Sequence, residues 1–173
     1  MSLVKLNLGC SDDHKPGYIN VDMGEPADVI CDLSKPWDDV FPENYADEVF
    51  AHDVAEHLPS KTFFMNQVWR VLKPGGLLDL AVPCVMLADG RVNSGAFADP
   101  THRTFWTLDD KYYYCTEWNN SSGERGRLGP NPSYGIKALF DIQSWTLVEY
   151  GKSHERRSKI IAKLRASKTN AYA

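Results

Sequence analysis

The chain has 173 residues, 43% hydrophobic and 24% charged, which is ordinary for one globular domain with its own core. The net charge is −4 and the sequence pI is near 5.7, so no overall positive field attracts nucleic acid or an acidic membrane. No apolar run approaches the roughly 20 residues of a membrane-spanning helix, and the N-terminus lacks a basic region followed by an apolar stretch. We therefore expect a cytoplasmic protein without membrane or nucleic-acid partners.

The 4 cysteines are spread singly, with no C-x-x-C pair. This spacing favours free thiols in a reducing compartment over disulfides. It also predicts no metal site, since Cys10 and His14 have no further ligands near them in the sequence.

Two short apolar runs, residues 3–8 and 18–21, predict the first two strands. The first run leads into Gly9, and a glycine lets a ligand lie against bare backbone because it has no Cβ. The second ends on Asp22, whose carboxylate can accept hydrogen bonds from a ribose diol. Together they predict a nucleotide-type cofactor site on an open α/β sheet.

Only residues 11–17 separate these two runs, whereas a parallel crossover normally takes a dozen or more residues and a helix. Pro16 and Gly17 also oppose a helix here. The two strands are therefore joined either by an abbreviated crossover or by a hairpin. We favour the crossover, because the segments that follow have a β/α pattern.

Further strands are predicted at residues 28–33, 46–51 and 77–83, the last of them almost continuously apolar, as in a buried parallel strand. Ser60 is a good N-cap for a helix whose apolar residues lie on one stripe. Lys, Pro and two Gly at residues 73–76 should stop that helix.

The regular pattern is lost from residue 86 to about residue 134, although many aromatic residues there argue against disorder. A short helix is predicted at residues 108–114, with Thr107 as N-cap. Residues 140–150 and 158–164 predict an antiparallel hairpin at one edge of the sheet. We expect one domain, with a cofactor-binding half (1–85), an irregular substrate-side segment (86–135) and a closing hairpin (136–167).

These pieces resemble the class I S-adenosylmethionine-dependent methyltransferases, and in particular their small, N-terminally truncated predicted members. Five segments carry the resemblance in the family's order: residues 6–11, 20–22, 30–33, 54–58 and 70–76. The last of them, R-V-L-K-P-G-G before a strand, is the most specific.

The resemblance implies an α/β, Rossmann-like fold with a mostly parallel central sheet and an antiparallel C-terminal hairpin. It implies S-adenosylmethionine as cofactor, with S-adenosylhomocysteine as product. The methionine part would lie near Gly9, the ribose on Asp22 and the adenine near residues 31–33. The expected cofactor-binding residues are Asn7, Gly9, Cys10, Ser11, Asp22, Met23, Cys31, Asp32, Leu33, His52 and Asp53.

The sequence also departs from the family pattern. Ser11 stands where the first motif usually has another glycine, and the helix that should follow is missing. This leaves two alternatives open: a smaller cofactor pocket, or one completed by another segment, a second copy in a homodimer or a partner protein.

His102 is the expected general base, because an imidazole titrates near neutrality and the neighbouring Asp99 could orient it. The alternative is that His102 and Arg103 only fix a loop. Arg103, Trp106 and His57 are the expected substrate contacts. The Asn-Pro-Pro-Tyr arrangement of many amide and nucleobase methyltransferases is absent from the sequence, which favours a small-molecule or glycan acceptor methylated on oxygen or nitrogen.

Two other functions are alternatives. One is a catalytically inactive module with this fold that binds a partner protein, suggested by the N-terminal truncation relative to the family. The other is a nicotinamide-dependent dehydrogenase. It is disfavoured because no G-x-G-x-x-G opens a helix and Asp22 follows Gly9 too closely.

Overall fold

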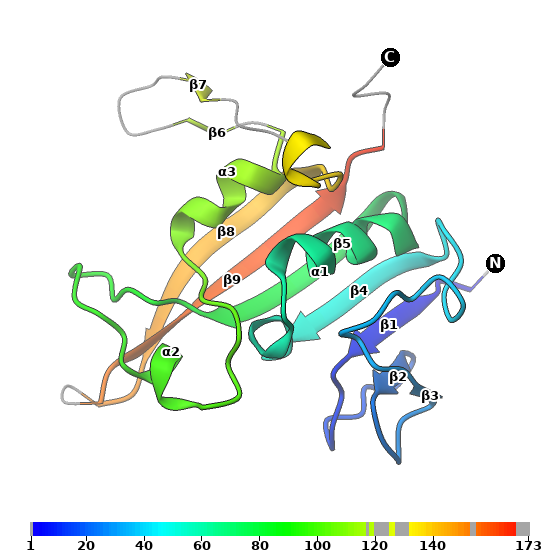
Figure 1. Ribbon diagram of the computed structural model, residues 1–173, viewed down its shortest axis with the longest axis horizontal. Coiled ribbons are helices and arrows are strands. Elements are labelled where there is room, and N and C mark those ends of the chain that lie inside the picture. Colours follow the sequence, from blue (N-terminus) through cyan, green and yellow to red (C-terminus); the bar gives the residue numbers. More distant parts are fainter. Residues whose placement is uncertain (1, 117, 120–124, 127–131, 153–154, 169–173) are drawn as a thin grey trace.

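The computed structural model describes residues 2–116, 118–119, 125–126, 132–152 and 155–168. A seven-stranded sheet forms its centre, with the strand order β3-β2-β1-β4-β5-β9-β8 (Figure 1). The strands are β1 (Lys5–Leu8), β2 (Ile19–Asp22), β3 (Val29–Ile30), β4 (Ala46–His52), β5 (Leu72–Pro83), β8 (Phe140–Tyr150) and β9 (Arg157–Ala166). The first five run parallel, and β8 and β9 form an antiparallel hairpin on β5. The predicted fold class is confirmed.

The remaining elements are short, apart from one helix. They are η1 (Ala55–His57), α1 (Lys61–Val71), α2 (Gly95–Ala98), η2 (Leu108–Asp110), α3 (Lys111–Tyr114), η3 (Pro132–Tyr134), and the separate strand pair β6 (Trp118–Asn119) and β7 (Arg125–Gly126). The predicted cap at Thr107 is confirmed, because its side chain and that of Asp110 form a capping box. Among the described residues, no helix is long and apolar enough to cross a membrane.

The connection between β1 and β2 is an abbreviated parallel crossover. Leu6 pairs with Ile19 and Leu8 with Val21 in a parallel ladder, and the intervening residues, all of them described, form turns instead of a helix. Asn7 organises this loop: its Nδ2 donates to the Asp13 carbonyl oxygen (2.8 Å) and to Asn20 Oδ1 (3.0 Å). A buried amide network therefore takes over the role of the missing helix.

Helix α1 begins at the predicted cap, where Ser60 Oγ accepts a hydrogen bond from the Phe63 amide (3.1 Å). It ends at Val71, and β5 starts at Leu72 rather than at Leu77. The ladder with β4 is interrupted between Ala46 and Glu48, so residues 73–76 bulge out of a strand that has already begun.

Among the described residues, the helices cover one face of the sheet. Figure 1 shows α1 and α3 lying over the same side of the strands, and Val49, Leu80 and Ala162 are fully buried beneath this layer. On the opposite face, His52 Nε2 lies 2.9 Å from Asp79 Oδ1, which links β4 to β5. Ion pairs from Asp79 to Lys163 (3.6 Å) and from Lys5 to Glu48 (2.9 Å) continue this polar surface.

Candidate functional site

Two cavities lie near the carboxyl ends of the parallel strands, where open α/β sheets bind ligands. We name them the Asp22 cavity and the His102 cavity. The Asp22 cavity has a volume of about 270 Å³ and is lined by Gly9, Asp22, Met23, Cys31, Asp32, Leu33, Ser34, Val54, His57, Leu58 and Arg103.

The floor of the Asp22 cavity is shaped by Gly9, which has a φ of +66°. A Cβ on Gly9 would lie 2.5 Å from Val54 Cγ2, so only glycine lets the end of β1 approach the segment after β4 this closely. The Asp22 carboxylate is fixed beside it. Its oxygens accept hydrogen bonds from the amides of Ser11 (2.9 Å) and Met23 (2.7 Å). Each oxygen keeps lone-pair capacity for a ligand hydroxyl.

The far wall of the Asp22 cavity is the turn after β3. The Cys31 amide donates to the Asp22 carbonyl oxygen (2.7 Å), which aligns this turn with the end of β2. Hydrogen bonds from Ser34 and Lys35 lower the pKa of Asp32 to about 2. This wall therefore presents an ionised carboxylate and the backbone of a short turn.

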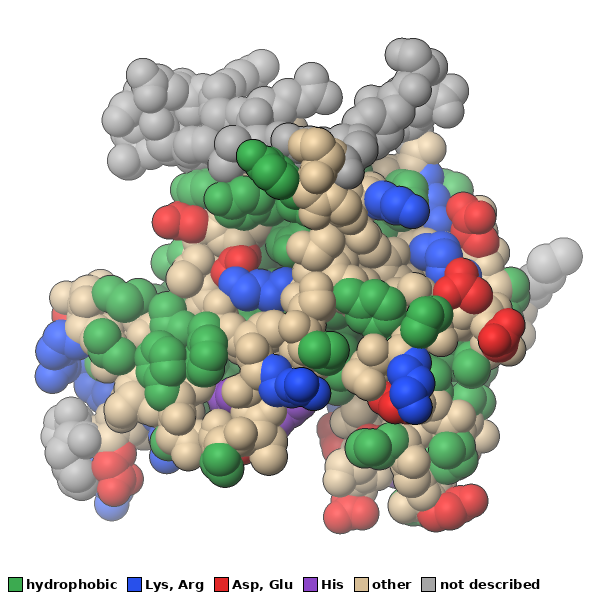
Figure 2. Space-filling model, viewed as in Figure 1, with side chains coloured by type: hydrophobic (Ala, Val, Ile, Leu, Met, Phe, Trp, Pro, Cys, Tyr) green, Lys and Arg blue, Asp and Glu red, His purple; other side chains and the backbone are tan. Residues whose placement is uncertain are grey.

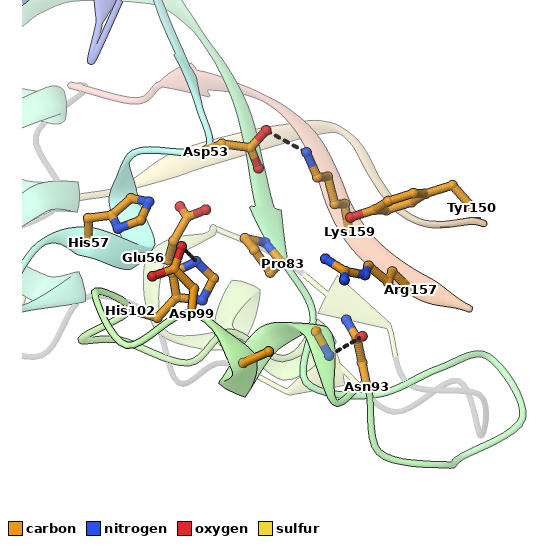
Figure 3. A pocket seen from close by; sticks show the side chains of 12 residues that line it. Asp53, Glu56, His57, Pro83, Asn93, Asp99, His102, Tyr150, Arg157 and Lys159 are labelled. Atoms are coloured by element: carbon orange, nitrogen blue, oxygen red, sulfur yellow. Dashed lines mark hydrogen bonds and ion pairs between the residues drawn. The ribbon is translucent and has the colours of Figure 1, made fainter. Parts of the chain in front are cut away.

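The His102 cavity has a volume of about 380 Å³ and lies at the ends of β5, β8 and β9 (Figure 3). Its lining residues are Asp53, Glu56, His57, Pro83, Asn93, Gly95, Ala98, Asp99, His102, Tyr150, Arg157 and Lys159. An ion pair between Asp53 and Lys159 spans it above the acidic and imidazole groups. His57 lines both cavities, so they meet at its side chain.

Hydrogen bonds to the short helix η1 bring the catalytic candidates together. The amides of Arg103 and Thr104 both donate to the Glu56 carbonyl oxygen, at 2.7 and 3.0 Å. The loop carrying His102 is thereby tied to the helix carrying His57, and their ring centroids lie 4.9 Å apart. Glu56 itself is 2% exposed, and burial raises its pKa to about 7.

Six of the expected cofactor residues line the Asp22 cavity: Gly9, Asp22, Met23, Cys31, Asp32 and Leu33. Five do not, and the structure gives the reason for each. Asn7 and Cys10 are buried, at 2% exposure each, and Asn7 holds the β1–β2 loop. Ser11 offers its amide to Asp22 instead of lining the cavity. His52 lies on the opposite face of the sheet, paired with Asp79, and Asp53 lines the other cavity.

The expected substrate-binding and catalytic residues do not lie together in one cavity. Trp106 is fully buried, which corrects its assignment as a substrate contact and places it in the core. Arg103 lines the Asp22 cavity, whereas Asp99 and His102 line the His102 cavity.

Asp99 does not orient His102 as the sequence suggested. The two side chains are 3.8 Å apart, and Asp99 Oδ1 accepts hydrogen bonds from the amide (2.8 Å) and hydroxyl (2.6 Å) of Thr101. His102 Nδ1 lies 2.8 Å from the Ala96 carbonyl oxygen, which orients the ring in place of the carboxylate.

Sequence reasoning missed several lining residues of the His102 cavity. Glu56 stands beside His57 in a recognised motif, but its burial leaves no local signature. Tyr150, Arg157 and Lys159 come from the hairpin, whose basic residues looked like those of an exposed edge strand. No signal in the sequence places them beside residues 53–57.

Comparison with known proteins bears on the family and the fold. Residues 24–80 match the family model described as "Methyltransferase domain". A search among curated proteins found no significant match. Solved structures resemble the chain closely in fold and weakly in sequence.

Three of these structures illustrate the likeness. A candidate methyltransferase from Bacillus halodurans has a TM-score of 0.59 and 12% identity, over 96% of this chain and 93% of that one. A SAM-dependent methyltransferase from Methanosarcina mazei has a TM-score of 0.56 and 14% identity, over 96% and 93%. The 1,6-didemethyltoxoflavin N1-methyltransferase of Burkholderia thailandensis, solved with S-adenosylhomocysteine, has a TM-score of 0.52 and 13% identity, over 95% and 71%. The predicted resemblance to the class I S-adenosylmethionine-dependent methyltransferases is therefore confirmed, by the segment that matches the family model and by a fold shared along almost the whole chain.

Proposed function

We propose that this protein is an S-adenosylmethionine-dependent methyltransferase that acts on an oxygen or nitrogen of a small-molecule or glycan acceptor. The cofactor would occupy the Asp22 cavity and the acceptor the His102 cavity. The observation that carries this proposal is that the two cavities adjoin at His57, at the carboxyl ends of the strands. A methyl donor and its acceptor need adjoining sites of this kind, since the transfer is an in-line displacement.

The residues of the Asp22 cavity fit the cofactor. Gly9 lines this cavity at the end of β1, where it would meet the methionine part of the cofactor. The Asp22 carboxylate is held by two backbone amides in a position to accept the ribose hydroxyls. When bound, the cofactor supplies an activated methyl group, so the protein mainly provides alignment.

The His102 cavity suits a polar acceptor that carries an anionic group. Arg157 forms no ion pair with any described residue, so its guanidinium is available to a carboxylate or phosphate. The Ala96 carbonyl oxygen can only accept, so His102 Nδ1 carries the proton and the neutral ring has its lone pair on Nε2. This nitrogen can take a proton from an acceptor hydroxyl or amine.

The alternative is an inactive module that binds a partner protein, and we favour the enzyme because of the polar face of the sheet. The helix-free face of the sheet carries ion pairs among the described residues, such as that of Lys5 with Glu48. A charged face of this kind tolerates water and does not call for a covering protein.

Calorimetric titration with S-adenosylmethionine and S-adenosylhomocysteine, with NADH as a control ligand, tests the cofactor site. We expect micromolar binding of the first two ligands, weakened at least about tenfold in Asp22→Ala because two hydrogen bonds to the ribose are worth this much or more. Asp39→Ala removes the same charge from an exposed residue outside both cavities, and it should bind like the wild type. Failure of the folded wild-type protein to bind either ligand would overturn the proposal.

A further inference from the structure

Glu56, His57 and His102 form a compact cluster at one end of the His102 cavity (Figure 3). A ligating atom of each residue lies within 4.8 Å of those of the other two. In the space-filling view, histidine side chains are visible only in small part, behind other residues (Figure 2). The sequence analysis predicted no metal site from Cys10 and His14 alone. It did not bring these three residues together, since Glu56 and His57 are more than 40 positions from His102.

Both imidazole rings are oriented by a hydrogen bond at Nδ1. His102 Nδ1 donates to the Ala96 carbonyl oxygen (2.8 Å). The Thr101 hydroxyl donates a hydrogen bond to Asp99 Oδ1 (2.6 Å). Its oxygen therefore accepts one from His57 Nδ1 (2.9 Å). Each neutral ring therefore has its lone pair on Nε2. Histidines that bind metals are characteristically fixed in this way, with the other ring nitrogen donating to a carbonyl or a carboxylate-linked group.

The Glu56 carboxylate is the third candidate ligand. Glu56 is 2% exposed, and its Oε2 has no hydrogen-bond partner among the described residues. A buried carboxylate oxygen without a partner is costly, and such exceptions in folded proteins call for an explanation such as an ion. Figure 3 shows the Glu56 side chain extending between His57 and the open part of the cavity.

We propose that Glu56, His57 and His102 bind a divalent transition-metal ion, with at least one coordination position open to the His102 cavity. Two imidazoles and one carboxylate suit Zn²⁺, Mn²⁺ or Fe²⁺, whereas Mg²⁺ and Ca²⁺ prefer oxygen ligands alone. Metal–ligand bonds of about 2.1 Å place tetrahedral ligand atoms about 3.4 Å apart. The three ligand atoms reach this spacing if side-chain rotations move them by about an ångström. Asp99 Oδ2, 3.8 Å from His102 Nε2, is near enough to assist.

The open position would face the proposed acceptor. A metal ion there would bind an acceptor hydroxyl and lower its pKa, so that the hydroxyl would lose its proton to water in the cavity before methyl transfer. This consequence rests on the proposed function, whereas metal binding itself does not. In the loaded protein His102 would be a ligand, so water would accept the proton in its place.

Tag-free protein, stripped with a chelator and dialysed, would be titrated with Zn²⁺ by calorimetry and with Co²⁺ by visible absorption. We expect one ion per chain, together with the d–d bands of Co²⁺ at a site with fewer than six ligands. His102→Gln, His57→Gln and Glu56→Gln should each lower the affinity at least about 100-fold. His14→Gln removes an exposed histidine outside the cavity and should leave binding unchanged.

The absence of saturable binding at one ion per chain in the folded wild-type protein overturns the proposal, as does equal affinity in His102→Gln. This result does not depend on a variant that fails to fold. S-adenosylmethionine is titrated separately into the metal-free and the Zn²⁺-loaded protein. Cofactor binding without metal binding refutes the metal site alone, and metal binding without cofactor binding refutes the proposed function alone.

Discussion

The close approach of Gly9 to Val54 can be tested by comparing Gly9→Ala with Gly17→Ala. Both glycines have positive φ angles, +66° and +80°, so alanine at either position pays the left-handed backbone penalty of about 1–2 kcal/mol. At Gly17 no described atom lies within 4 Å of the added Cβ. At Gly9 the Cβ would meet Val54 Cγ2 at 2.5 Å and Val54 Cβ at 2.7 Å. Overpacking of this kind costs about a further 1–3 kcal/mol.

Gly9→Ala should therefore lower the free energy of unfolding by about 2–5 kcal/mol, and Gly17→Ala by about 1–2 kcal/mol. Urea denaturation of the two variants and the wild type measures this difference. Val54 is only 8% exposed, which leaves its side chain little room to move away. Equal costs for the two substitutions would refute the reasoning, since they would mean that the turn after β1 shifts freely.

Two further predictions concern buried polar groups. Asp110→Ala should cost about 2–4 kcal/mol, because it breaks a partly buried ion pair with Lys61 (2.6 Å) and the cap with Thr107. Asp38→Ala breaks only an exposed pair and should cost under about 0.5 kcal/mol in the same urea assay; similar costs would contradict the argument. Burial raises the pKa of Tyr114 from 10.0 to about 12, so the neutral phenol stabilises the fold fully below pH 10 and progressively less up to pH 12. Over that range the unfolding free energy of Tyr114→Phe should fall less steeply than that of the wild type, by up to about 2–3 kcal/mol, and parallel curves would show that the shift is absent.

Features fixed by neighbouring residues were predicted from the sequence. The predicted caps at Ser60 and Thr107 depend on groups three positions along the chain, the Phe63 amide and the Asp110 side chain, so the local pattern contains them whole. The two caps were predictable because nothing distant in the chain decides them. Residues 11–17 and Pro16 left a crossover or a hairpin open, and the β/α pattern of the segments that follow favoured the crossover.

Residues whose roles depend on distant partners were not predicted. His52 follows the predicted fourth strand, and only the register shows that its side chain lies on the face of Asp79, away from the cofactor. Lys159 lies beside Asp53 because β9 is inserted next to β5, which no pattern near either residue indicates. Asn7 looked like part of a cofactor motif, but its partners show that this β1 residue holds the loop between β1 and β2.

The carboxylate of Asp79 fits the helix-free face of the sheet. A central strand covered by helices on both faces has a nearly continuous apolar run, and the apolar run of β5 is interrupted at this position. In a two-sided fold the carboxylate would be buried beneath a helix, at a cost of several kcal/mol. Here it meets His52 and Lys163 on a face over which the described residues place no helix. The charged residue within an otherwise apolar strand is therefore a sign, readable in the sequence, that one face of β5 is not covered by a helix.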